Sequence, residues 1–467
     1  MKNEKITIEK ICEFVEGIET LVPTISGQMR QYVNLDNAAS TPTFTIITKK
    51  VNEFLKWYSN VHRGTGFKSR LCSKIFEEAR EIISKFVGAD KKSDVILFCK
   101  NTTEGINKLA NRYPFELGDI VLTSVMEHHS NELPWRKVAE VIHIGITEDG
   151  KIDETDFKQK LSLYGKKIKL VAISGASNVT GYVNPIHTYA KWVHEIGAEI
   201  FIDAAQLAPH RKINMHPINE DEKIDYLAFS AHKLYAPFGI GVLIGKKNIF
   251  EIGAPEIVGG GAVDIVTLED AYWTSLPDKE EAGTPDIVGV VALAQAILII
   301  EEIGWEKIVE HENELTRYAF SKLKNISKIK LIGDTENLSN RLGVLSFNIE
   351  GMPHGLVASI LSFEFAIGTR NGCFCAHPYV KCLLNVSKTE SDEMEKNILN
   401  RNRSNIPGFV RASLGIYSSK NDVDELANAL DEITKGNYKD GYYLDVERGE
   451  YLRKDFNENF SNYFKLI

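Results

Sequence analysis

The feature that most constrains the fold is a regular alternation along residues 35–245. Short apolar runs rich in branched side chains are separated by amphipathic or mixed segments, which is typical of buried strands alternating with helices. One helix is indicated by apolar residues at helical spacing from Leu71 to Phe86, with Gly88 as a stop signal. The alternation predicts a mostly parallel sheet covered on both faces. Six runs are predicted as strands: 95–98, 120–123, 170–173, 200–202, 226–229 and 241–244.

A different pattern begins near residue 305. The elements predicted around it are a long apolar helix over 286–303 closed by Gly304, a helix over 306–323, a strand over 344–347 and a helix over 354–362. We therefore predict an α/β fold with two domains. The large domain, 34–304, has a mostly parallel seven-stranded sheet, and the smaller α+β domain combines 305–467 with 1–33. The last thirty residues carry no motif.

Bulk composition excludes several classes of function. The 467-residue chain is 43% hydrophobic and 25% charged, which is ordinary for a globular protein, and a net charge of −9 without a long basic run argues against nucleic-acid partners. The longest apolar stretch, 290–300, contains Gln295 and is too short to cross a membrane. The N-terminus lacks a signal-peptide core, and six cysteines in so long a chain do not indicate a disulfide framework. We expect a cytoplasmic protein with reduced thiols.

Two charged side chains stand at the ends of predicted strands. Lys233 follows the strand over 226–229, and Asp203, thirty residues earlier, ends the strand over 200–202. A lysine that binds pyridoxal 5'-phosphate needs an acid partner for the pyridine nitrogen, because that pairing makes the ring an electron sink. Lys233 and Asp203 have the residue types, order and settings for this pair.

Further polar residues near strand ends could bind the phosphate of such a cofactor. Thr102 and Thr103 open a predicted helix, whose free N–H groups and dipole attract anions, although Thr103 could instead be a simple helix cap. Ser230 and His232 precede Lys233 and can also donate to a phosphate. His232 could alternatively be an exposed surface residue.

Two other residues could contact the cofactor ring. His128, in Glu127-His-His129, follows the strand over 120–123, where a flat imidazole can stack on an aromatic ring. Paired histidines also suggest a metal, but no third ligand stands at helical spacing. Gln206 could bind the phenolic oxygen of the ring, or it could be part of a solvent-exposed helix start.

The stretch 370–377 is a second centre of reactive residues. Cys373, Cys375 and His377 alternate, so an extended backbone would point all three to one side. The three residues could form a metal site. Alternatively, one of the cysteines could be a reactive thiol on a mobile loop, or both cysteines could be buried in a glycine turn.

Arginines near this stretch could bind a substrate. Arg411 stands within an apolar run, where an arginine is costly without a partner. A substrate carboxylate gripped bidentately is one partner, and an internal salt bridge is the other. Arg370 is a further candidate for substrate binding.

Ten segments occur in an order that resembles a known family. They are Leu35-Asp-Asn-Ala-Ala-Ser-Thr-Pro42, Val61-His-Arg-Gly64, Asn101-Thr-Thr-Glu-Gly105, Glu127-His-His129, Asn178-Val-Thr-Gly181, Asp203-Ala-Ala-Gln206, Ser230-Ala-His-Lys233, Gly259-Gly-Gly261, Glu281-Ala-Gly-Thr-Pro285 and Arg411-Ala-Ser-Leu414. The chain is similar to the class V aminotransferase superfamily of pyridoxal-phosphate enzymes, whose fold is the transferase fold type I. Within it, the chain most resembles the cysteine desulfurases and selenocysteine lyases.

The resemblance implies a role for each matching residue. Lys233 would bind the cofactor, Asp203 would pair with its ring nitrogen, His128 would stack on the ring, Gln206 would contact the phenolic oxygen and Asn178 would lie beside substrate and cofactor. Thr102, Thr103, Ser230 and His232 would hold the phosphate, while Thr284 would reach the phosphate site of a neighbouring subunit in a homodimer. Cys375 aligns with the nucleophile, in an Arg-x-Gly-x-x-Cys stretch that begins at Arg370, a substrate-binding candidate, and Arg411 would bind the substrate carboxylate.

The chain departs from the family pattern just before the nucleophile. Desulfurases of this kind usually carry histidines at the two preceding positions, where this chain has Cys373 and Phe374. The preferred hypothesis is a cysteine desulfurase that takes sulfur from L-cysteine as a persulfide on Cys375, releases L-alanine and passes the sulfur to an acceptor protein. The alternatives are another class V enzyme, such as a transaminase, epimerase or C–S lyase in which Cys375 is not catalytic, and a metal- or sulfur-binding scaffold.

Overall fold

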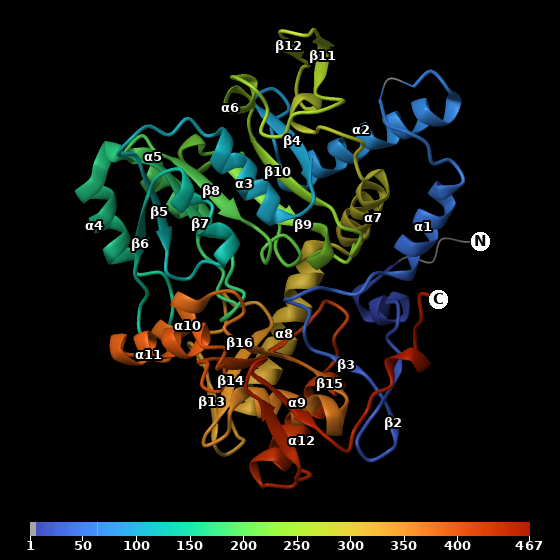
Figure 1. Ribbon diagram of the computed structural model, residues 1–467, viewed down its shortest axis with the longest axis vertical. Helices are drawn as coiled ribbons and strands as arrows, with labels where there is room; N and C mark the ends of the chain where they lie inside the picture. Colours follow the sequence, from blue (N-terminus) through green and yellow to red (C-terminus); the bar gives the residue numbers. More distant parts are fainter. Residues whose placement is uncertain (1–5, 63) are drawn as a thin grey trace.

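A seven-stranded sheet forms the centre of the larger half of the protein, in a computed structural model that describes residues 6–62 and 64–467 (Figure 1). Its strands are β4 (Asp94–Cys99), β5 (Ile120–Ser124), β6 (Glu140–Ile144), β7 (Ile168–Ser174), β8 (Glu199–Asp203), β9 (Tyr226–Ser230) and β10 (Gly241–Lys246), in the order β4-β10-β9-β8-β7-β5-β6. All pairs are parallel except those of β10, which runs antiparallel to β4 and β9. The predicted α/β fold and mostly parallel sheet are confirmed.

All six strands expected from the sequence are present, and β6 is the one that no apolar run indicated. It lies at the edge of the sheet beside β5, and most of its residues are only partly buried, including the polar His143. An edge strand of this kind does not need a continuous apolar run, which explains why the sequence pattern did not reveal it.

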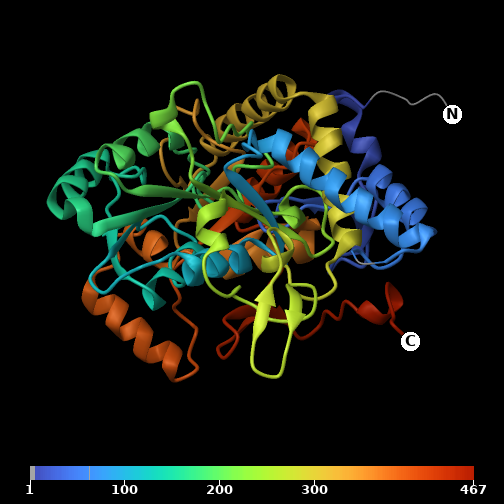
Figure 2. The same ribbon diagram turned by 90° about the horizontal axis from the view of Figure 1, so that it is seen from above.

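Side chains that alternate along the strands divide the core into two parts. Ile96 and Phe98 of β4 belong to the larger cluster, whereas Val95 and Leu97 belong to a second cluster on the opposite face. The helices α1 (Thr45–Leu55), α2 (Phe67–Val87), α4 (Glu154–Tyr164), α5 (Ile186–Glu195) and α7 (Ile287–Ile303) contribute to the first cluster, and α3 (Thr102–Arg112) and α6 (Lys247–Glu251) to the second. Both faces are therefore covered, as Figure 2 shows from above.

Helix ends follow the signals in the sequence. The helix α2 ends at Gly88, whose φ of 65° is the left-handed value that glycine adopts without strain. The helix α7 begins after Asp286, whose side chain accepts a hydrogen bond from the N–H of Gly289.

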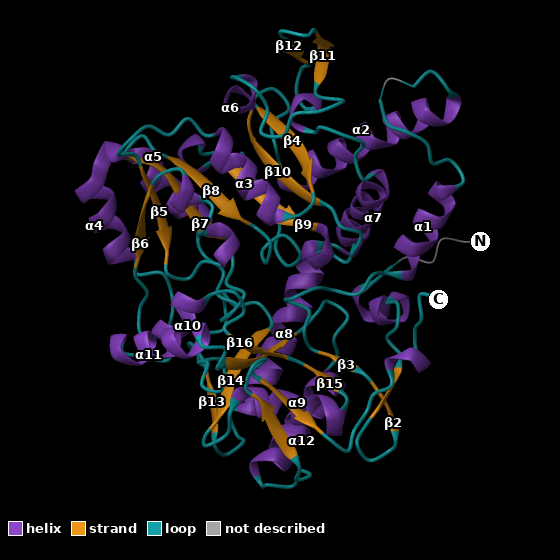
Figure 3. Cartoon of the chain, viewed as in Figure 1, coloured by secondary structure: helices purple, strands orange, loops and turns teal. Residues whose placement is uncertain are grey.

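The smaller half, which contains α8, α9 and α12 (Figure 3), is built on a four-stranded antiparallel sheet. Its strand order is β13-β14-β17-β16. Its elements are β13 (Ile329–Leu331), β14 (Val344–Ile349), β16 (Arg370–Gly372), β17 (Phe409–Ser413), α8 (Trp305–Leu323), α9 (His354–Phe365), α10 (His377–Leu383), α11 (Lys388–Leu399) and α12 (Lys420–Thr434). A separate hydrophobic cluster joins this sheet to α8, α9 and α12. This half agrees with the α+β pattern expected after residue 305, while the exact domain boundaries stay a prediction.

The N-terminal segment joins the smaller half. β3 (Val33–Asn34) pairs in parallel with β15 (Ile367–Gly368), and Leu35 lies in the core of the smaller half. Three small hairpins complete the fold: β1 (Leu21–Pro23) with β2 (Met29–Gln31), β11 (Val263–Val266) with β12 (Ala271–Trp273), and β18 (Tyr442–Asp445) with β19 (Glu450–Arg453). The last of these falls largely within the segment in which the sequence showed no motif. Figure 1 shows the β11–β12 hairpin projecting from the end of the molecule opposite the smaller half.

Among the residues that the structure describes, no single helix is both long enough and apolar enough to span a membrane. The helices α7 and α8 meet that criterion only as a pair, and they are bent by 81° at their junction.

Candidate active site

A cavity of about 240 Å³ lies at the carboxyl ends of the parallel strands, between the two halves of the protein. Strands β7, β8 and β9 end at this edge, and β4 runs in the same direction, so the residues that follow all four strands converge. The cavity collects twelve of the candidate residues named from the sequence: Thr102, Thr103, His128, Asn178, Asp203, Gln206, Ser230, His232, Lys233, Arg370, Cys375 and Arg411.

Lys233 lies in a short 3₁₀ turn that follows β9. Within residues 6–62 and 64–467, its amine forms no hydrogen bond and no ion pair. Burial lowers its pKa from 10.5 to about 8; the charge of Asp203 opposes this shift, and that of Arg411 adds to it. An amine with this pKa is partly uncharged at neutral pH and can therefore act as a nucleophile or a base.

Asp203 ends β8 and is buried, with 6% of its surface exposed. The N–H of Ala205 donates to its Oδ1 over 2.9 Å. Burial raises the pKa of this carboxyl, while the Ala205 hydrogen bond and the charge of Lys233 oppose the rise. The carboxyl is therefore placed to share a proton with a basic group in the cavity.

Hydroxyl groups gather where α3 meets the end of β9. The N–H of Thr102 donates to Ser230 Oγ over 2.8 Å, and the two hydroxyl oxygens are 2.6 Å apart. The cap of α3 is Asn101, whose side chain accepts from the N–H of Glu104, so the interpretation of Thr103 as the helix cap is wrong. The Thr103 hydroxyl instead contacts that of Ser130 at 2.7 Å. This turn offers N–H and O–H donors to an anion.

Two histidines of the cavity are held in the neutral form. Burial, followed by the charge of Lys233, lowers the pKa of both His128 and His232 to about 4. The N–H of Ser130 donates to His128 Nδ1 over 3.1 Å, so the proton of this ring is on Nε2. His232 is half-buried in the cavity, so its interpretation as an exposed surface residue is wrong.

Two amide side chains tie the cavity wall to the rest of the protein. Gln206 is 5% exposed and donates from Nε2 to the carbonyl of Ala38 over 2.7 Å, so it does not belong to a solvent-exposed helix start. Asn178 donates from Nδ2 to the carbonyl of Phe374 over 2.7 Å, and its own carbonyl accepts from Arg411 Nη1 over 2.9 Å. Asn178 thus connects the larger half to both β17 and the cysteine segment.

Asp36 sits between two arginines that face each other across neighbouring strands. Arg370 of β16 is the register partner of Arg411 of β17. Asp36 Oδ1 lies 2.9 Å from Arg411 Nη2, and its Oδ2 lies 3.3 Å from Arg370 Nη1. The internal salt bridge considered for Arg411 is therefore present. One carboxylate shared by two guanidinium groups still leaves a net positive charge, and the buried Arg411 Nε has no hydrogen-bond partner in the described structure. A substrate carboxylate would supply both the missing charge and an acceptor.

The cysteine segment is not extended. Phe374 and Cys375 have φ angles of 51° and 56°, so the expectation of three side chains on one side of an extended backbone is wrong. Cys373 is buried and donates from Sγ to the carbonyl of Pro407 over 2.9 Å, and burial raises its pKa to about 12. Cys375 is an exposed free thiol on the cavity wall. In the described part of the chain, no three potential metal ligands are grouped as a metal site.

Comparisons with known proteins agree with this site. The sequence pattern of the family described as aminotransferase class-V matches residues 33–426. A probable cysteine desulfurase from Staphylococcus aureus (strain COL) is 37% identical over 428 residues, which make up 90% of this chain and 95% of that protein. A cysteine desulfurase from Haloferax volcanii is 33% identical over 408 residues, or 85% of this chain and 88% of that protein. The apo structure of a cysteine desulfurase from Thermococcus onnurineus NA1 matches with a TM-score of 0.79 at 30% identity, covering 93% of this chain and 99% of that one.

The chain belongs to the class-V aminotransferase family. The resemblance inferred from the ordered motifs is confirmed, and so is the fold type that it implied.

The residues of the cavity fit pyridoxal phosphate, the cofactor on which this family depends. The amine of Lys233 has no partner among the described residues and is available to an aldehyde. The buried Asp203 carboxyl suits a ring nitrogen, and the start of α3 with Thr102 and Ser230 suits a phosphate. The individual roles of these residues stay predictions.

Three candidates from the sequence, Thr284, Cys373 and His377, do not line this cavity. Thr284 lines a different cavity of about 240 Å³, together with the buried Lys108 and Glu280. Its proposed contact with the phosphate site of a second subunit involves another chain and stays a prediction. Arg63, in the second of the ten motifs, lies outside the described residues.

Sequence reasoning missed a buried carboxyl network behind the cavity. Glu127 accepts hydrogen bonds from Ser124, Ser174 and Asn131, the last two over 2.6 and 2.7 Å. Burial raises the pKa of Glu127 to about 7, although these hydrogen bonds oppose the rise. Sequence reasoning also missed Asp36, although this residue stands in the first of the ten motifs. Glu127 and Asp36 each follow an apolar residue in the sequence. This local pattern does not show which distant side chains the two carboxylates contact.

Proposed function

We propose that the protein is a pyridoxal-phosphate-dependent cysteine desulfurase that transfers sulfur from L-cysteine to Cys375 and releases L-alanine. The observation that carries this proposal is the exposed thiol of Cys375, which shares one cavity with the unpaired amine of Lys233 and the arginine pair. The names of the relatives from Staphylococcus aureus and Haloferax volcanii support it.

The residues of the cavity have different roles in the proposed reaction. Arg411 and Arg370 bind the substrate carboxylate, because Asp36 compensates only one of their two charges. Bound pyridoxal phosphate would supply an electron sink for the substrate α-carbon. Lys233 would accept the α-proton with its amine, Asp203 would hold the ring nitrogen of the cofactor, and the neutral His128 would lie beside the ring.

The sulfur transfer balances without an external oxidant or reductant. The thiolate of Cys375 attacks the substrate sulfur, so an S–S bond forms and the substrate C–S bond breaks. The electron pair of the broken bond ends in a C–H bond of the product. L-cysteine and the Cys375 thiol thus become L-alanine and a persulfide on Cys375.

Three finer statements belong to the same proposal. The enzyme acts as a homodimer in which Thr284 completes the phosphate site of the other subunit. The persulfide passes to a sulfur-acceptor protein, because an exposed thiol can be reached from outside. We place the reaction in the cytoplasm, where the free thiols of this chain would remain reduced.

The decisive experiment measures alanine formation from L-cysteine by the wild type, Cys375→Ser and Cys373→Ser. The wild type should form alanine, and Cys375→Ser should lose several powers of ten in rate while keeping its cofactor, since loss of a covalent nucleophile typically has an effect on the order of this size. Cys373→Ser should retain most of the activity, because the thiol of Cys373 is buried against Pro407. Wild-type turnover by Cys375→Ser would instead support a transaminase, an epimerase or a C–S lyase.

A further inference from the structure

The backbone that carries the reactive thiol adopts a conformation that must be held in place. Phe374 and Cys375 are consecutive residues with left-handed φ angles of 51° and 56°. Residues other than glycine adopt this region at a cost, because the Cβ atom crowds the backbone. A pair of such residues at a functional position persists only when surrounding contacts fix it.

Main-chain contacts fix the turn on its inner side. The carbonyl of Phe374 accepts from Asn178 Nδ2 over 2.7 Å, and the carbonyl of Cys375 accepts from the N–H of His129 over 2.7 Å. The N–H of Ala376 donates to the carbonyl of Cys373 over 2.9 Å. His129 therefore contacts the residue that bears the thiol, although the two are far apart in the sequence.

The side chain of His377 makes a second connection to His129. The two imidazole rings are stacked, with centroids 4.8 Å apart and planes 7° apart. His377 Nδ1 lies 3.0 Å from His129 Nε2, and the main-chain N–H of His377 donates to the same Nε2 over 3.2 Å. His129 Nε2 must therefore be an acceptor, so the proton of this ring is on Nδ1 and the donor is His377 Nδ1–H.

The charges around this pair favour the neutral rings. Burial lowers the pKa of both His129 and His377. At His129, the charges of His377 and Arg136 lower the pKa further, while Glu132 opposes the shift. At His377, the charge of Lys381 lowers the pKa further. His143 and Glu127 also line the cavity of about 230 Å³ beside the two rings. A neutral His129 is the form that can accept both hydrogen bonds from His377.

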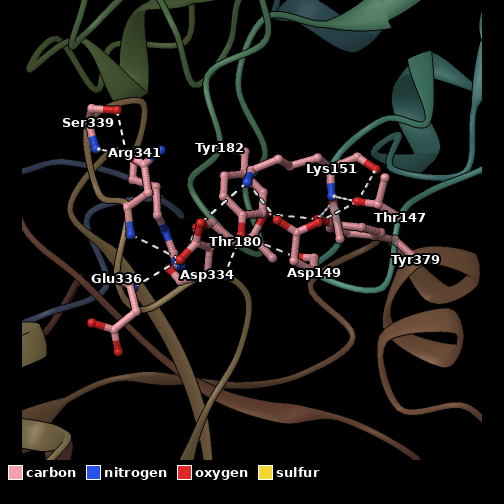
Figure 4. A network of polar contacts seen from close by, with 12 residues as sticks. Thr147, Asp149, Lys151, Thr180, Tyr182, Asp334, Glu336, Ser339, Arg341 and Tyr379 are labelled. Carbon is pink, nitrogen blue, oxygen red and sulfur yellow. Dashed lines mark hydrogen bonds and ion pairs between the residues drawn. The ribbon is translucent and has the colours of Figure 1, made fainter. Parts of the chain in front are cut away.

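The chain is anchored again two residues after His377. Tyr379 is fully buried, and its hydroxyl contacts Thr180 Oγ1 at 2.9 Å and donates to the carbonyl of Gly150 over 2.5 Å. Figure 4 shows Tyr379 beside Thr180, in a network that continues to Arg341. The freedom of the thiol thus depends on what holds the short segment between Cys373 and Tyr379.

We propose that His377 is a positioning residue for Cys375, acting through His129 to fix the left-handed turn that presents the thiol to the cavity. The inference rests on the proposed function for its kinetic consequence, but the geometry of the turn can be measured without turnover. His377 itself does not line the cavity that contains Lys233 and Cys375. The His377 ring stacks on His129 and donates a hydrogen bond to it, and this contact orients His129. Without the ring, the hydrogen bond from the His129 N–H to the Cys375 carbonyl loses that support.

The first test compares His377→Ala and His377→Asn with the wild type in alanine formation from L-cysteine. His377→Ala should lower kcat about ten- to a hundredfold, the effect of a small misplacement of a reacting group, and should change KM much less. His377→Asn should recover most of kcat, because its amide N–H, like Nδ1–H, is attached to the γ-carbon and can donate to His129. In the wild type, kcat should fall as the pH drops through the lowered pKa of His129, and His377→Ala should lose this dependence.

The second test needs no turnover. Hydrogen exchange in the peptide covering 372–380 should be at least about threefold faster in His377→Ala, with wild-type rates in His377→Asn, since a loosened turn opens more often. His187→Ala is the matched control, because it removes a histidine of α5 that hydrogen-bonds the carbonyl of Glu222, outside the cavity. Cofactor absorbance in each variant shows that it is folded.

The two tests separate the possible failures. If the wild type forms no alanine, the proposed function fails, while faster exchange in His377→Ala still supports the positioning role. If alanine forms and both kcat and exchange in His377→Ala equal those of the wild type, the positioning role is overturned. Equal loss of kcat in His377→Ala and His377→Asn would also overturn it, because the shared N–H donor would then be irrelevant.

Discussion

The two walls of the cavity are built in different ways. Asp203 ends one strand of the central sheet and Lys233 lies in the short turn after another, so the core of the larger half fixes where their backbones lie. Cys375 instead stands on a loop of the smaller half, is exposed, and occupies a left-handed turn. The central sheet holds the residues of the first wall in place, whereas the position of the second wall depends on a few contacts made across the cavity.

This difference separates the two halves of the proposed chemistry. Cofactor binding and proton transfer depend on the wall that carries Lys233 and Asp203, the strand-end wall. Sulfur transfer depends on the wall that carries Cys375, the loop wall. Changes in the first wall should alter the cofactor signal together with activity. Changes in the second should leave the cofactor bound and impair only the later step.

The largest effect is expected for Lys233→Ala. Removing the unpaired amine should abolish the visible absorbance that appears when the purified protein is incubated with pyridoxal phosphate, and alanine formation should fall by about four powers of ten or more. The control is Lys246→Ala, which removes a lysine paired with Glu199 and Asp225 at the opposite edge of the sheet. A Lys233→Ala protein with wild-type absorbance would contradict the assignment of the strand-end wall.

How far the sequence predicts the site follows the same division. Asp203 and Lys233 stand at or near the ends of buried strands, and parallel strands end at one edge, so a local pattern was enough to bring them together. The loop wall offered no such rule. Spacing alone treated Cys373 and Cys375 alike, yet one thiol is buried against Pro407 and the other is exposed.

Contacts between distant residues account for what the sequence did not reveal. His129 and His377 are 248 residues apart, and Asp36 is 375 residues from Arg411. No periodicity links such positions, because their contact depends on how the two halves of the protein pack. The seventh strand, β6, escaped prediction for a different reason: its burial is partial, so its apolar pattern is weak.

A smaller effect is expected for Asp36→Asn, which tests the arginine pair. Without this carboxylate, two guanidinium groups oppose each other across β16 and β17, and Arg411 keeps only its hydrogen bond to the Asn178 carbonyl. We expect kcat/KM for L-cysteine to fall about ten- to a hundredfold, mainly through KM, with the cofactor signal retained.

Asp424→Asn is the control for this change, since Asp424 pairs with Lys322 at 2.7 Å on the outer side of the smaller half. An unchanged KM in Asp36→Asn would show that the pair does not bind the substrate carboxylate. The internal ion pair would then be purely structural.

A smaller, graded effect is expected from pH. Uptake of pyridoxal phosphate by the cofactor-free protein requires the uncharged amine of Lys233, whose pKa burial lowers to about 8. The rate constant should therefore rise with pH and level off above this value. At pH 7, about a tenth of the amine is uncharged, far more than for an ordinary lysine. Stopped-flow absorbance across a pH series measures the midpoint.

Asp203→Asn sharpens this prediction. The negative charge of Asp203 raises the pKa of Lys233, so its removal should move the midpoint of cofactor uptake to lower pH. A midpoint near the ordinary value of lysine in the wild type would mean that the amine is not shielded from water as the structure indicates.

The smallest effect is expected for Tyr379→Phe, which loosens the loop wall without touching the cavity. The change removes a buried hydroxyl and leaves the Gly150 carbonyl and the Thr180 hydroxyl without this partner. Unfolding free energy should fall by about 1–3 kcal/mol, the usual cost of an unsatisfied buried group, and kcat should fall only a fewfold. Chemical denaturation and alanine formation measure the two quantities.

The control is Tyr442→Phe, which removes a partly buried hydroxyl bonded to Glu364 at 3.0 Å, away from the cavity. Because Tyr379 lies beyond His377, a loss of kcat as large as that of His377→Ala would mean that the loop wall responds as one unit, whereas the structure indicates that its support is concentrated at the stacked pair of histidines.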